Sequence, residues 1–534
     1  MRSGTVALAC GARCAQVDRR RFLQLAAGAV AGLGIRPSAA TASDLERAAD
    51  SLALRVHRAT RNTRAGAIGR ALWPGGAGAR AGPRPGPVRV ALPAIGPPGG
   101  PPLAHVVQRF APAARLDAGE LPLGTLARLL HLTNGITRPG RVPLRAAPSA
   151  GALYAGEVYV VAARVAGLDP GAYAYDVFGH ELVGSAAEAR LAAVAAALEA
   201  PESIARAPVC VLLTNVFARY TQRYANRGYR YALIDTGHIG ENLRLVAASE
   251  GLATCSPLRF HDRALNRLLG CDGREEAVCA VHGVGPAPAG TEPARSQPFV
   301  EAHTRAGFGF DPGGTEPERY HAATSLLPGD GVAAAAAEPR SAPVPGGRAL
   351  PDRATPSASV AVSIVERRSA TNFEGGPLAL ADLGFLLRCA QGNSAATQAA
   401  GVELRVLAHR VDGLEPGIHR YLPESHRLVP VATGRAIADD TRRACGGQEL
   451  AGSAAAGFAM LADLASAGSG RDRRYRDLLI EAGAIGQRVY LAAESVGIAA
   501  RNLAAFYDDE LNALLRADGR RRAVVHLTMA GPGN

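Results

Sequence analysis

The chain contains a long internal repeat, and no other feature of the sequence restricts its fold as strongly. Tyr229–Pro286 aligns with Tyr475–Pro532 without a gap, at a constant separation of 246 residues. Glycines recur at matching places, so that Gly237 corresponds to Gly483. A repeat of this length indicates two copies of one structural unit, each forming the same helices and strands.

The same separation continues upstream, with one interruption. The segment EVYVVAARV beginning at Glu157 matches ELRVLAHRV at Glu403, again 246 residues apart. Further upstream, LLHLTNG ending at Gly135 matches LLRCAQG ending at Gly392, but at a separation of 257 residues. The second copy therefore lacks eleven residues between this helix and the next strand. We interpret the pattern as a tandem duplication with one local deletion.

Each unit is predicted to mix helices and strands. Alternating apolar residues in 157–165 predict a strand, followed by the turn GLDPG. Apolar residues at helical spacing predict a helix over 231–251, with Gly251 as its stop, and 275–285 reads as a closing strand. Helices outnumber strands and do not alternate simply with them. The α+β class is therefore preferred to a doubly wound α/β fold.

The repeat also predicts where the domains begin and end. A signal peptide is expected at 1–42, a first domain at 43–286 and a second domain at 357–534. Residues 287–356 are rich in Pro, Ala and Gly and are expected to connect the two.

The net charge of +12 does not indicate a nucleic-acid partner. Residues 1–42 contain six arginines and one aspartate, so they carry +5 of that charge. The other arginines are scattered among acidic residues, without a basic stripe or a nucleic-acid-binding module. The eight cysteines form no C-x-x-C pair or zinc spacing, so no metal site is predicted. All 59 basic residues are arginines, whose side chains cannot act as proton acceptors.

The N-terminus has the order of a twin-arginine export signal. DRRRFLQ at 18–24 overlaps a mild apolar run, and Ala40-Thr41-Ala42 offers a cleavage site. The run is about a dozen residues, whereas a membrane-spanning helix needs roughly 20. The protein is therefore expected in the periplasm or cell exterior, with no stable membrane span after signal removal. The alternative is a basic leader on a cytoplasmic protein.

Several short motifs follow one another as they do in one enzyme family. They are HRAT at 57–60, PSAGALY at 148–154, RYANRGYRYALIDTGHIGENL at 223–243, GLATC at 251–255 and, in the second copy, ERRS at 366–369. Over about residues 55–285 and 357–532 the chain resembles the nitroreductase superfamily. Within it, the motifs are most similar to the azoline-oxidising (SagB-type) dehydrogenases that mature thiazole- and oxazole-containing peptides. The resemblance implies two tandem nitroreductase-like domains that form a pseudo-dimer within one chain.

The resemblance also implies that FMN binds between the domains. An arginine with a nearby hydroxyl would bind its phosphate, and a Pro-Ser-Ala-Gly loop would bring unobstructed backbone to its ring. The implied cofactor-binding residues are Arg58, Thr60, Pro148, Ser149, Ala150, Gly151, Gly251, Arg367, Arg368, Ser369, Gly497 and Ile498.

The deletion makes the two composite sites unequal. One would combine the Pro148–Gly151 loop with the arginine–serine motif and the Gly497 turn of the second copy. The opposite site would have Arg58 and Thr60 but no partner loop, because the deletion removes it. One FMN per chain is therefore expected, in the first of these sites.

Two departures from the family pattern bear on this expectation. Thr371 stands where the R-R-S-x-R motif has a cation that contacts the flavin ring. The sequence also ends two residues after Pro532, where relatives place basic phosphate-binding residues. Only the first copy continues, and Arg295 is its nearest arginine.

The same resemblance points to Arg223 and Tyr224 as catalytic residues. Azoline-oxidising relatives carry a Lys-Tyr pair here that is thought to remove the substrate proton, but arginine stays charged. Tyr224 could act as an acid or base if its pKa, ordinarily about 10, were lowered, and Arg223 would act in that direction. The alternative is that both residues simply cover a helix surface.

Three functions remain open at this level. The first is an FMN-dependent dehydrogenase that takes a hydride onto flavin N5 from a small-molecule or modified-peptide substrate. The second is an NAD(P)H-dependent nitro or quinone reductase. The third is a degenerate relative that binds flavin or a peptide without turnover, which the deletion, Thr371 and the missing lysine would favour.

Overall fold

The computed structural model describes residues 51–64, 88–110, 112–185, 191–288, 300–302, 315–326, 332–334, 346–391, 401–467 and 472–534. All of them lie within one compact unit, Glu46–Asn534. The expected signal peptide at 1–42 falls outside the described residues.

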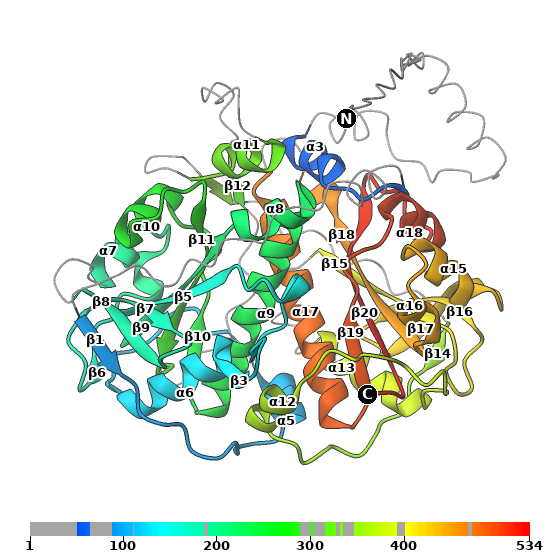
Figure 1. Ribbon diagram of the computed structural model, residues 1–534, viewed down its shortest axis with the longest axis horizontal. Helices are drawn as coiled ribbons and strands as arrows, with labels where there is room; N and C mark the ends of the chain where they lie inside the picture. Colours follow the sequence, from blue (N-terminus) through cyan, green and yellow to red (C-terminus); the bar gives the residue numbers. More distant parts are fainter. Residues whose placement is uncertain are drawn as a thin grey trace, which may run out of the picture. The chain divides into compact units, whose positions relative to one another are not determined.

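Two seven-stranded antiparallel sheets with the same topology form the framework (Figure 1). The first has the order β1-β8-β7-β5-β9-β11-β10 and the second the order β14-β17-β16-β15-β18-β20-β19. Matching strands of the two copies occupy matching places, as a duplication requires. The prediction of two tandem α+β domains is confirmed.

The strand bounds follow the repeat. The first sheet contains β1 (Val88–Ala91), β5 (Gly156–Ala162), β7 (Gly171–Asp176), β8 (Glu181–Ser185), β9 (Val209–Val216), β10 (Ala253–Cys255) and β11 (Glu276–Gly285). The second contains β14 (Arg348–Ala349), β15 (Val402–Ala408), β16 (Gly417–Leu422), β17 (Arg427–Thr433), β18 (Ala456–Asp463), β19 (Ala499–Asn502) and β20 (Arg522–Gly531). Even the β-bulge recurs: the pairing skips Cys279 in β11 and Val525 in β20, which are 246 residues apart.

Three short strand pairs and the helices complete the described elements. The pairs are β2 (Leu121–Pro122) with β6 (Val165–Ala166), β3 (Ile136–Arg138) with β4 (Leu144–Arg145), and β12 (Val300–Ala302) with β13 (Val332–Ala334). Helices up to the connector are α3 (Leu52–Ala59), α5 (Leu103–Arg109), α6 (Leu123–Asn134), α7 (Leu191–Ala196), α8 (Ala218–Tyr224), α9 (Arg227–Ser249), α10 (Asp262–Leu269) and α11 (Glu316–Ala323). The later helices are α12 (Val360–Glu366), α13 (Leu380–Gln391), α15 (Ile437–Ala444), α16 (Glu449–Ser453), α17 (Arg474–Ser495) and α18 (Asp508–Leu514). The 3-10 turns are η1 (Ala150–Ala152), η2 (Pro201–Ser203) and η4 (Leu464–Ala467).

The two long helices α9 and α17 pack side by side between the sheets (Figure 1). Nearly every residue of α9 is buried, because α9 also packs against its own sheet and against α6. A helix covered on all sides needs apolar or small residues around its whole circumference. The run YALIDTGHIGENLRLVAAS is largely apolar or small, with Gly237 and Gly240 where neighbours approach closely. Its buried polar residues include Asp235, which is hydrogen-bonded, and Glu241, which pairs with arginines.

The arginine- and tyrosine-rich segment before the expected helix is itself helical. α8 ends at Tyr224, Ala225 turns sharply with a φ of 48°, and α9 begins at Arg227, earlier than the expected 231. The predicted end is confirmed, since Gly251 has a φ of 73° just beyond α9.

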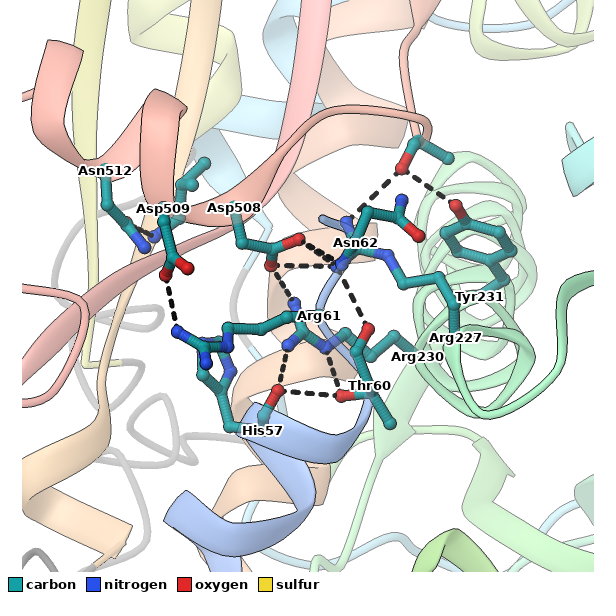
Figure 2. A network of polar contacts seen from close by, with 12 residues as sticks. His57, Thr60, Arg61, Asn62, Arg227, Arg230, Tyr231, Asp508, Asp509 and Asn512 are labelled. Atoms are coloured by element: carbon teal, nitrogen blue, oxygen red, sulfur yellow. Dashed lines mark hydrogen bonds and ion pairs between the residues drawn. The ribbon is translucent and has the colours of Figure 1, made fainter. Parts of the chain in front are cut away.

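A buried ion-pair network joins the two domains (Figure 2). Arg227 and Arg230 of α9 bind Asp508, the first residue of α18, at nitrogen–oxygen distances of 2.7 and 2.6 Å. The same carboxylate accepts a hydrogen bond from the backbone N–H of Asn62 at 2.9 Å. The start of the first domain, α9 and the second domain are thereby held together at one carboxylate.

The repeat generates a second network of the same form. Arg473, the residue just before α17, and Arg476 within α17 bind Asp262, the first residue of α10, at 2.6 and 3.0 Å. Each of these three residues is separated by 246 positions from its counterpart in the first network. Such reciprocal contacts are those of an isologous dimer interface, and they support the pseudo-dimer arrangement within one chain.

Part of the connector is also structural. α11 starts with a capping box formed by Thr315 and Glu318. Tyr320 is fully buried, and its hydroxyl donates to the carbonyl oxygen of Asp472. The backbone N–H of Leu326 donates to Asp262 at 2.8 Å. This short helix therefore braces one of the two networks, which the Pro-, Ala- and Gly-rich composition did not predict.

Candidate active site

The Pro148–Gly151 segment forms a tight loop that leads into η1 of the first domain. The Ser149 hydroxyl accepts a hydrogen bond from the backbone N–H of Tyr154 at 2.8 Å and so closes the loop. Gly151, Ala152 and Tyr154 have φ values of 63°, 54° and 48°. Residues other than glycine seldom adopt such values, and backbone of this kind is common at functional sites.

Tyr224, the last residue of α8, lies directly against this loop. A Cβ on Gly151 would collide with the Tyr224 hydroxyl and would lie 3.8 Å from the guanidinium carbon of Arg223. The Arg223 guanidinium is 5.7 Å from the centre of the Tyr224 ring. Arg223 is exposed and Tyr224 is half-buried. The structure thus brings the two predicted catalytic residues to the predicted cofactor loop.

The condition under which Tyr224 could act as a base is not met. Arg223 lowers the pKa of Tyr224, in the expected direction, but burial raises it by more, and Tyr231 and Asp235 raise it further. The pKa of Tyr224 is therefore raised, because burial outweighs one exposed cation. A tyrosine with a raised pKa keeps its proton at neutral pH, so Tyr224 can donate a hydrogen bond but not accept a proton.

Sequence reasoning misses two residues of this site, Asp235 and Tyr220. Asp235 is 6% exposed and accepts hydrogen bonds from the Tyr220 hydroxyl and, at 3.3 Å, from the Ala150 backbone N–H. Burial raises the pKa of Asp235 to about 7, although Tyr220, Ala150 and Ser149 lower it by hydrogen bonding. The available signal was an acidic residue within an apolar helix, matched by Glu481 in the second copy.

Arg367, at the end of α12 in the second domain, contacts the first domain just before this loop. It donates from Nε to the carbonyl of Ala146 at 3.2 Å and from Nη2 to that of Arg145 at 3.3 Å. Its guanidinium carbon lies 5.2 Å from the centre of the Tyr490 ring. Arg367 is buried, and its Nη1 has no hydrogen-bond partner among the described residues. The interdomain site therefore contains a buried cation with one N–H group lacking an acceptor.

The neighbours of Arg367 are held by local contacts. Arg368 donates to the carbonyl of Val365 at 2.8 Å and so covers the end of α12. The Ser369 hydroxyl lies 2.9 Å from that of Tyr490, which also accepts from the backbone N–H of Asn502 at 2.8 Å. Tyr490 thereby places a hydroxyl beside the buried cation.

Comparison with known proteins identifies the family. The family model named Nitroreductase family matches residues 115–285 and 364–531, together more than half of the chain. The chain belongs to the nitroreductase family. The two matches coincide with the two domains, so each copy of the repeat is a nitroreductase domain.

Two similar proteins are also named as nitroreductases. A provisionally named nitroreductase of Methanocaldococcus jannaschii is 33% identical over 152 residues, which are 28% of this chain and 76% of that protein. The crystal structure of a provisionally named nitroreductase from Anabaena variabilis has a TM-score of 0.67 at 25% identity, over 91% of this chain and 100% of that chain. That match extends through both domains, so the tandem arrangement occurs in another nitroreductase.

A third similarity is weaker. The Escherichia coli microcin synthetase McbBCD complex matches 34% of this chain and 70% of that chain, at 24% identity and a TM-score of 0.31. A likeness of that size supports no inference about the reaction.

Nitroreductases commonly bind FMN, and the residues between the domains fit it by their donor chemistry. A flavin phosphate is bound by guanidinium and hydroxyl groups, which Arg367, Arg368 and Ser369 provide. Nη1 of Arg367 is buried and has no acceptor in the part of the chain that the structure describes, as expected of a group that binds an anion. Thr371, in contrast, donates to the Oδ1 of Asn534 at 3.0 Å and contributes no positive charge.

Gly251 and Gly497 occupy equivalent helix ends in the two nitroreductase domains. Their φ values are 73° and 70°. The backbone N–H of Leu252 donates to the carbonyl of Ala247 at 2.9 Å, and that of Ile498 makes the matching bond at 2.9 Å. This is the hydrogen-bond pattern that ends helices at a left-handed residue. The helix ends thus explain why glycine stands at both positions. Contact of either glycine with a cofactor stays a prediction.

Thr60 lies inside the Asp508 network (Figure 2). Its hydroxyl donates to the carbonyl of Val56 at 2.7 Å and accepts from Nε of Arg230 at 2.6 Å. The hydroxyl predicted to bind phosphate is therefore engaged in the interdomain network, beside a carboxylate that would repel an anion.

Arg58 remains half-buried at the edge of that network. Burial lowers the pKa of Arg58, and the nearby cations Arg520 and Arg61 lower it further. The segment where the deletion is predicted to remove the partner loop includes residues 392–400, which lie outside the described residues. The expectation of one composite site per chain therefore stays a prediction.

Three further observations concern the part of the chain that the structure describes. It contains no group of three or more His, Cys, Asp or Glu side chains arranged to hold a metal ion. None of its helices is long and apolar enough to cross a membrane. Its six cysteines are buried free thiols, which pack as small hydrophobic residues.

Proposed function

We propose that this nitroreductase is an FMN-dependent oxidoreductase with one composite site, formed by the Pro148–Gly151 loop and the Arg367–Ser369 segment. One observation carries the proposal. Arg367 of the second domain binds the carbonyls of Arg145 and Ala146, which directly precede the loop that Tyr224 contacts. The domains thus supply a cationic segment and a glycine-bearing loop to one place.

In this proposal the chain's own residues bind and orient. Arg367, Arg368 and Ser369 would hold the FMN phosphate. Bound FMN would supply hydride exchange at its N5 atom. Tyr224, protonated at neutral pH, would donate a hydrogen bond to a substrate heteroatom beside Gly151. Arg223 is exposed and would attract a carbonyl or carboxylate group of the substrate.

The azoline-oxidising (SagB-type) activity is the finer proposal. It is supported by the position of Arg223 and Tyr224, which stand where those dehydrogenases carry their Lys-Tyr pair and which lie against the loop. The substrate would be a modified peptide or a small heterocycle that loses a hydride and a proton. The missing lysine requires that another group accept the proton.

The test begins with the purified full chain. A yellow protein, or one that gains a flavin spectrum when FMN is added, is expected, and lack of both would contradict the proposal. Bleaching by NADH or NADPH would assign a nitro or quinone reductase. A flavoprotein that neither nicotinamide reduces, but that a thiazoline or oxazoline peptide bleaches, would assign the dehydrogenase.

We also propose export through the twin-arginine route, supported by the DRRRFLQ segment and the A-x-A site. Residues 1–42 fused to a reporter should direct its export. Replacement of Arg19, Arg20 and Arg21 by lysine should abolish that export, and continued export would contradict the proposal.

A further inference from the structure

The proposed site needs a proton acceptor that neither Arg223 nor Tyr224 can provide. Arginine stays charged, and burial keeps the Tyr224 hydroxyl protonated. A carboxylate in contact with the same loop, that of Asp235, has the required chemistry. It lies on α9 and is 6% exposed. Among the described residues no arginine pairs with it in an ion pair, unlike Asp508 or Asp262.

A chain of hydroxyl groups leads from Asp235 to the half-exposed loop. The Tyr220 hydroxyl donates to the Asp235 carboxylate. The Ser149 oxygen lies 2.6 Å from the Tyr220 hydroxyl oxygen and accepts from the Tyr154 backbone N–H at 2.8 Å. The backbone N–H of Ala150 donates to Asp235 at 3.3 Å. Asp235 and Tyr220 are buried, whereas Ser149 is only partly so, so the chain joins a buried end to an accessible one.

The direction of these hydrogen bonds depends on the charge of Asp235. When the carboxylate is ionised, Ser149 donates to Tyr220 and Tyr220 donates to Asp235, so every proton points inward. When Asp235 is protonated, it donates to the Tyr220 oxygen and Tyr220 donates to Ser149. The Ser149 hydroxyl is then free to donate toward the site.

We infer that Asp235 stores the proton released by the substrate, and that this proton enters and leaves through Ser149 and Tyr220. The inference rests on the proposed function for the origin of the proton. A proton arriving at the Ser149 oxygen displaces the Ser149 hydrogen to Tyr220, and the Tyr220 hydrogen passes to Asp235. One negative charge is neutralised, no electrons move, and return of the proton reverses the same steps. Asp235 does not touch the substrate itself and acts through Tyr220 and Ser149.

The surrounding charges leave Asp235 as the group that titrates. Tyr220 and Tyr224 on α8 keep their protons, because burial raises the pKa of both. The cations Arg219 and Arg145 interact with another carboxylate: Arg219 is paired with Glu157 at 2.6 Å, and Arg145 interacts with the same Glu157. Arg223 lies over the ring of Tyr224, 5.7 Å from its centre. The pKa of Asp235 stands at about 7, where a proton store is most effective near neutral pH.

The test is an infrared titration of the full chain without added FMN. A carboxylic-acid band that disappears with a midpoint near pH 7 is expected in the parent and absent in Asp235→Asn. Tyr220→Phe and Ser149→Ala should each raise that midpoint, because each removes a hydrogen bond that favours the carboxylate. Tyr229→Phe is the matched control. The ring of Tyr229 is buried on α9, the helix that also carries Asp235, and its hydroxyl lies 3.0 Å from Nδ1 of His321 rather than near Asp235. It should leave the midpoint unchanged.

A midpoint near the ordinary value of about 4, or one that neither Tyr220→Phe nor Ser149→Ala moves, would overturn the inference. In protein that binds FMN and turns over, Asp235→Asn and Tyr220→Phe should lower kcat at least tenfold and remove the ionisation near pH 7 from the profile. An unchanged profile would also overturn it. Failure to bind FMN contradicts the proposed function alone, because the titration does not need the cofactor.

Discussion

Gly237 and Gly483 face each other where α9 crosses α17, and neither position has room for a side chain. A Cβ on Gly237 would collide with the carbonyl oxygen of Ile480, and one on Gly483 would collide with that of Ile234. These are one contact repeated by the pseudo-twofold symmetry, since Gly483 lies 246 positions after Gly237 and Ile480 lies 246 positions after Ile234. The two helices therefore meet backbone to backbone at this crossing.

Gly237→Ala should destabilise the protein by about 3 kcal/mol or more, because the added methyl group forces two buried helix backbones apart. Denaturant unfolding measures the effect. Gly124→Ala is the control, since Gly124 lies in α6 with nothing within 4 Å of its added Cβ. That variant should be unchanged or up to about 1 kcal/mol more stable. Equal stability of the two variants would contradict the close crossing.

Asp508→Asn should cost about 3–5 kcal/mol at neutral pH, because it leaves two buried guanidinium groups without their counter-charge. Burial alone would raise the pKa of Asp508, but Arg227 and Arg230 hold it below its ordinary value. A depressed folded-state pKa stabilises the protein above the unfolded value of about 4, and this contribution is lost as pH falls below it. The difference between parent and variant should therefore shrink in acid.

The neighbouring Asp509 provides the control for that experiment. Its carboxylate pairs with Arg61 at 2.5 Å but is 60% exposed, so Asp509→Asn should cost less than about 1 kcal/mol. Urea unfolding between pH 3 and 7 compares the two. A similar loss in both variants would refute the importance of the buried network.

Arg367→Gln should weaken FMN binding about 10- to 100-fold, the range expected for losing a hydrogen bond to a charged group. Arg58→Gln, at the matching position of the opposite site, should leave the affinity unchanged. Flavin fluorescence titration gives both dissociation constants and the stoichiometry. The far-UV circular dichroism spectrum of Arg367→Gln, compared with that of the parent, checks that the loss is not one of folding. Two equivalent FMN sites per chain would contradict the asymmetric arrangement.

Asp235→Asn should become progressively more stable relative to the parent as pH rises from about 4 to about 7. The pKa of Asp235 is raised to about 7 in the folded protein, so the parent binds its proton more tightly when folded. That stabilisation is complete below the unfolded pKa of about 4 and lost as pH rises through 7, a change of up to about 4 kcal/mol. Unfolding free energies at pH 4 and pH 8 measure it, and a constant difference would refute it.

The sequence predicted the large features correctly because they depend on regular patterns. The separation of 246 residues predicted two copies of one domain, and the helix stop at Gly251 followed from a glycine after an apolar helical run. The start of α9 was placed too late, because the predicted helix began only at the apolar run that follows the arginines. Arg227 and Arg230 belong to α9 as buried cations that bind Asp508, a partner 278 positions beyond Arg230.

The site was predicted in part for the same reason. Its motifs placed Ser149, Gly151, Tyr224 and Arg367 on separate segments, and the structure brings these segments together. The raised pKa of Tyr224 could not be predicted, because it depends on how much of the ring other segments bury.

The sequence by itself determined that this chain has two copies of one α+β unit, that they belong together and that their motifs are unequal. Those properties follow from the spacing of residues along the chain and from the repeat, both of which can be read from the sequence alone. Only the tertiary structure decided that Asp235 meets Ser149 through Tyr220 and that Thr60 is held by Arg230. Long-range contacts choose partners among many residues of the same type, and burial then sets their charge, so neither can be read from neighbours along the chain.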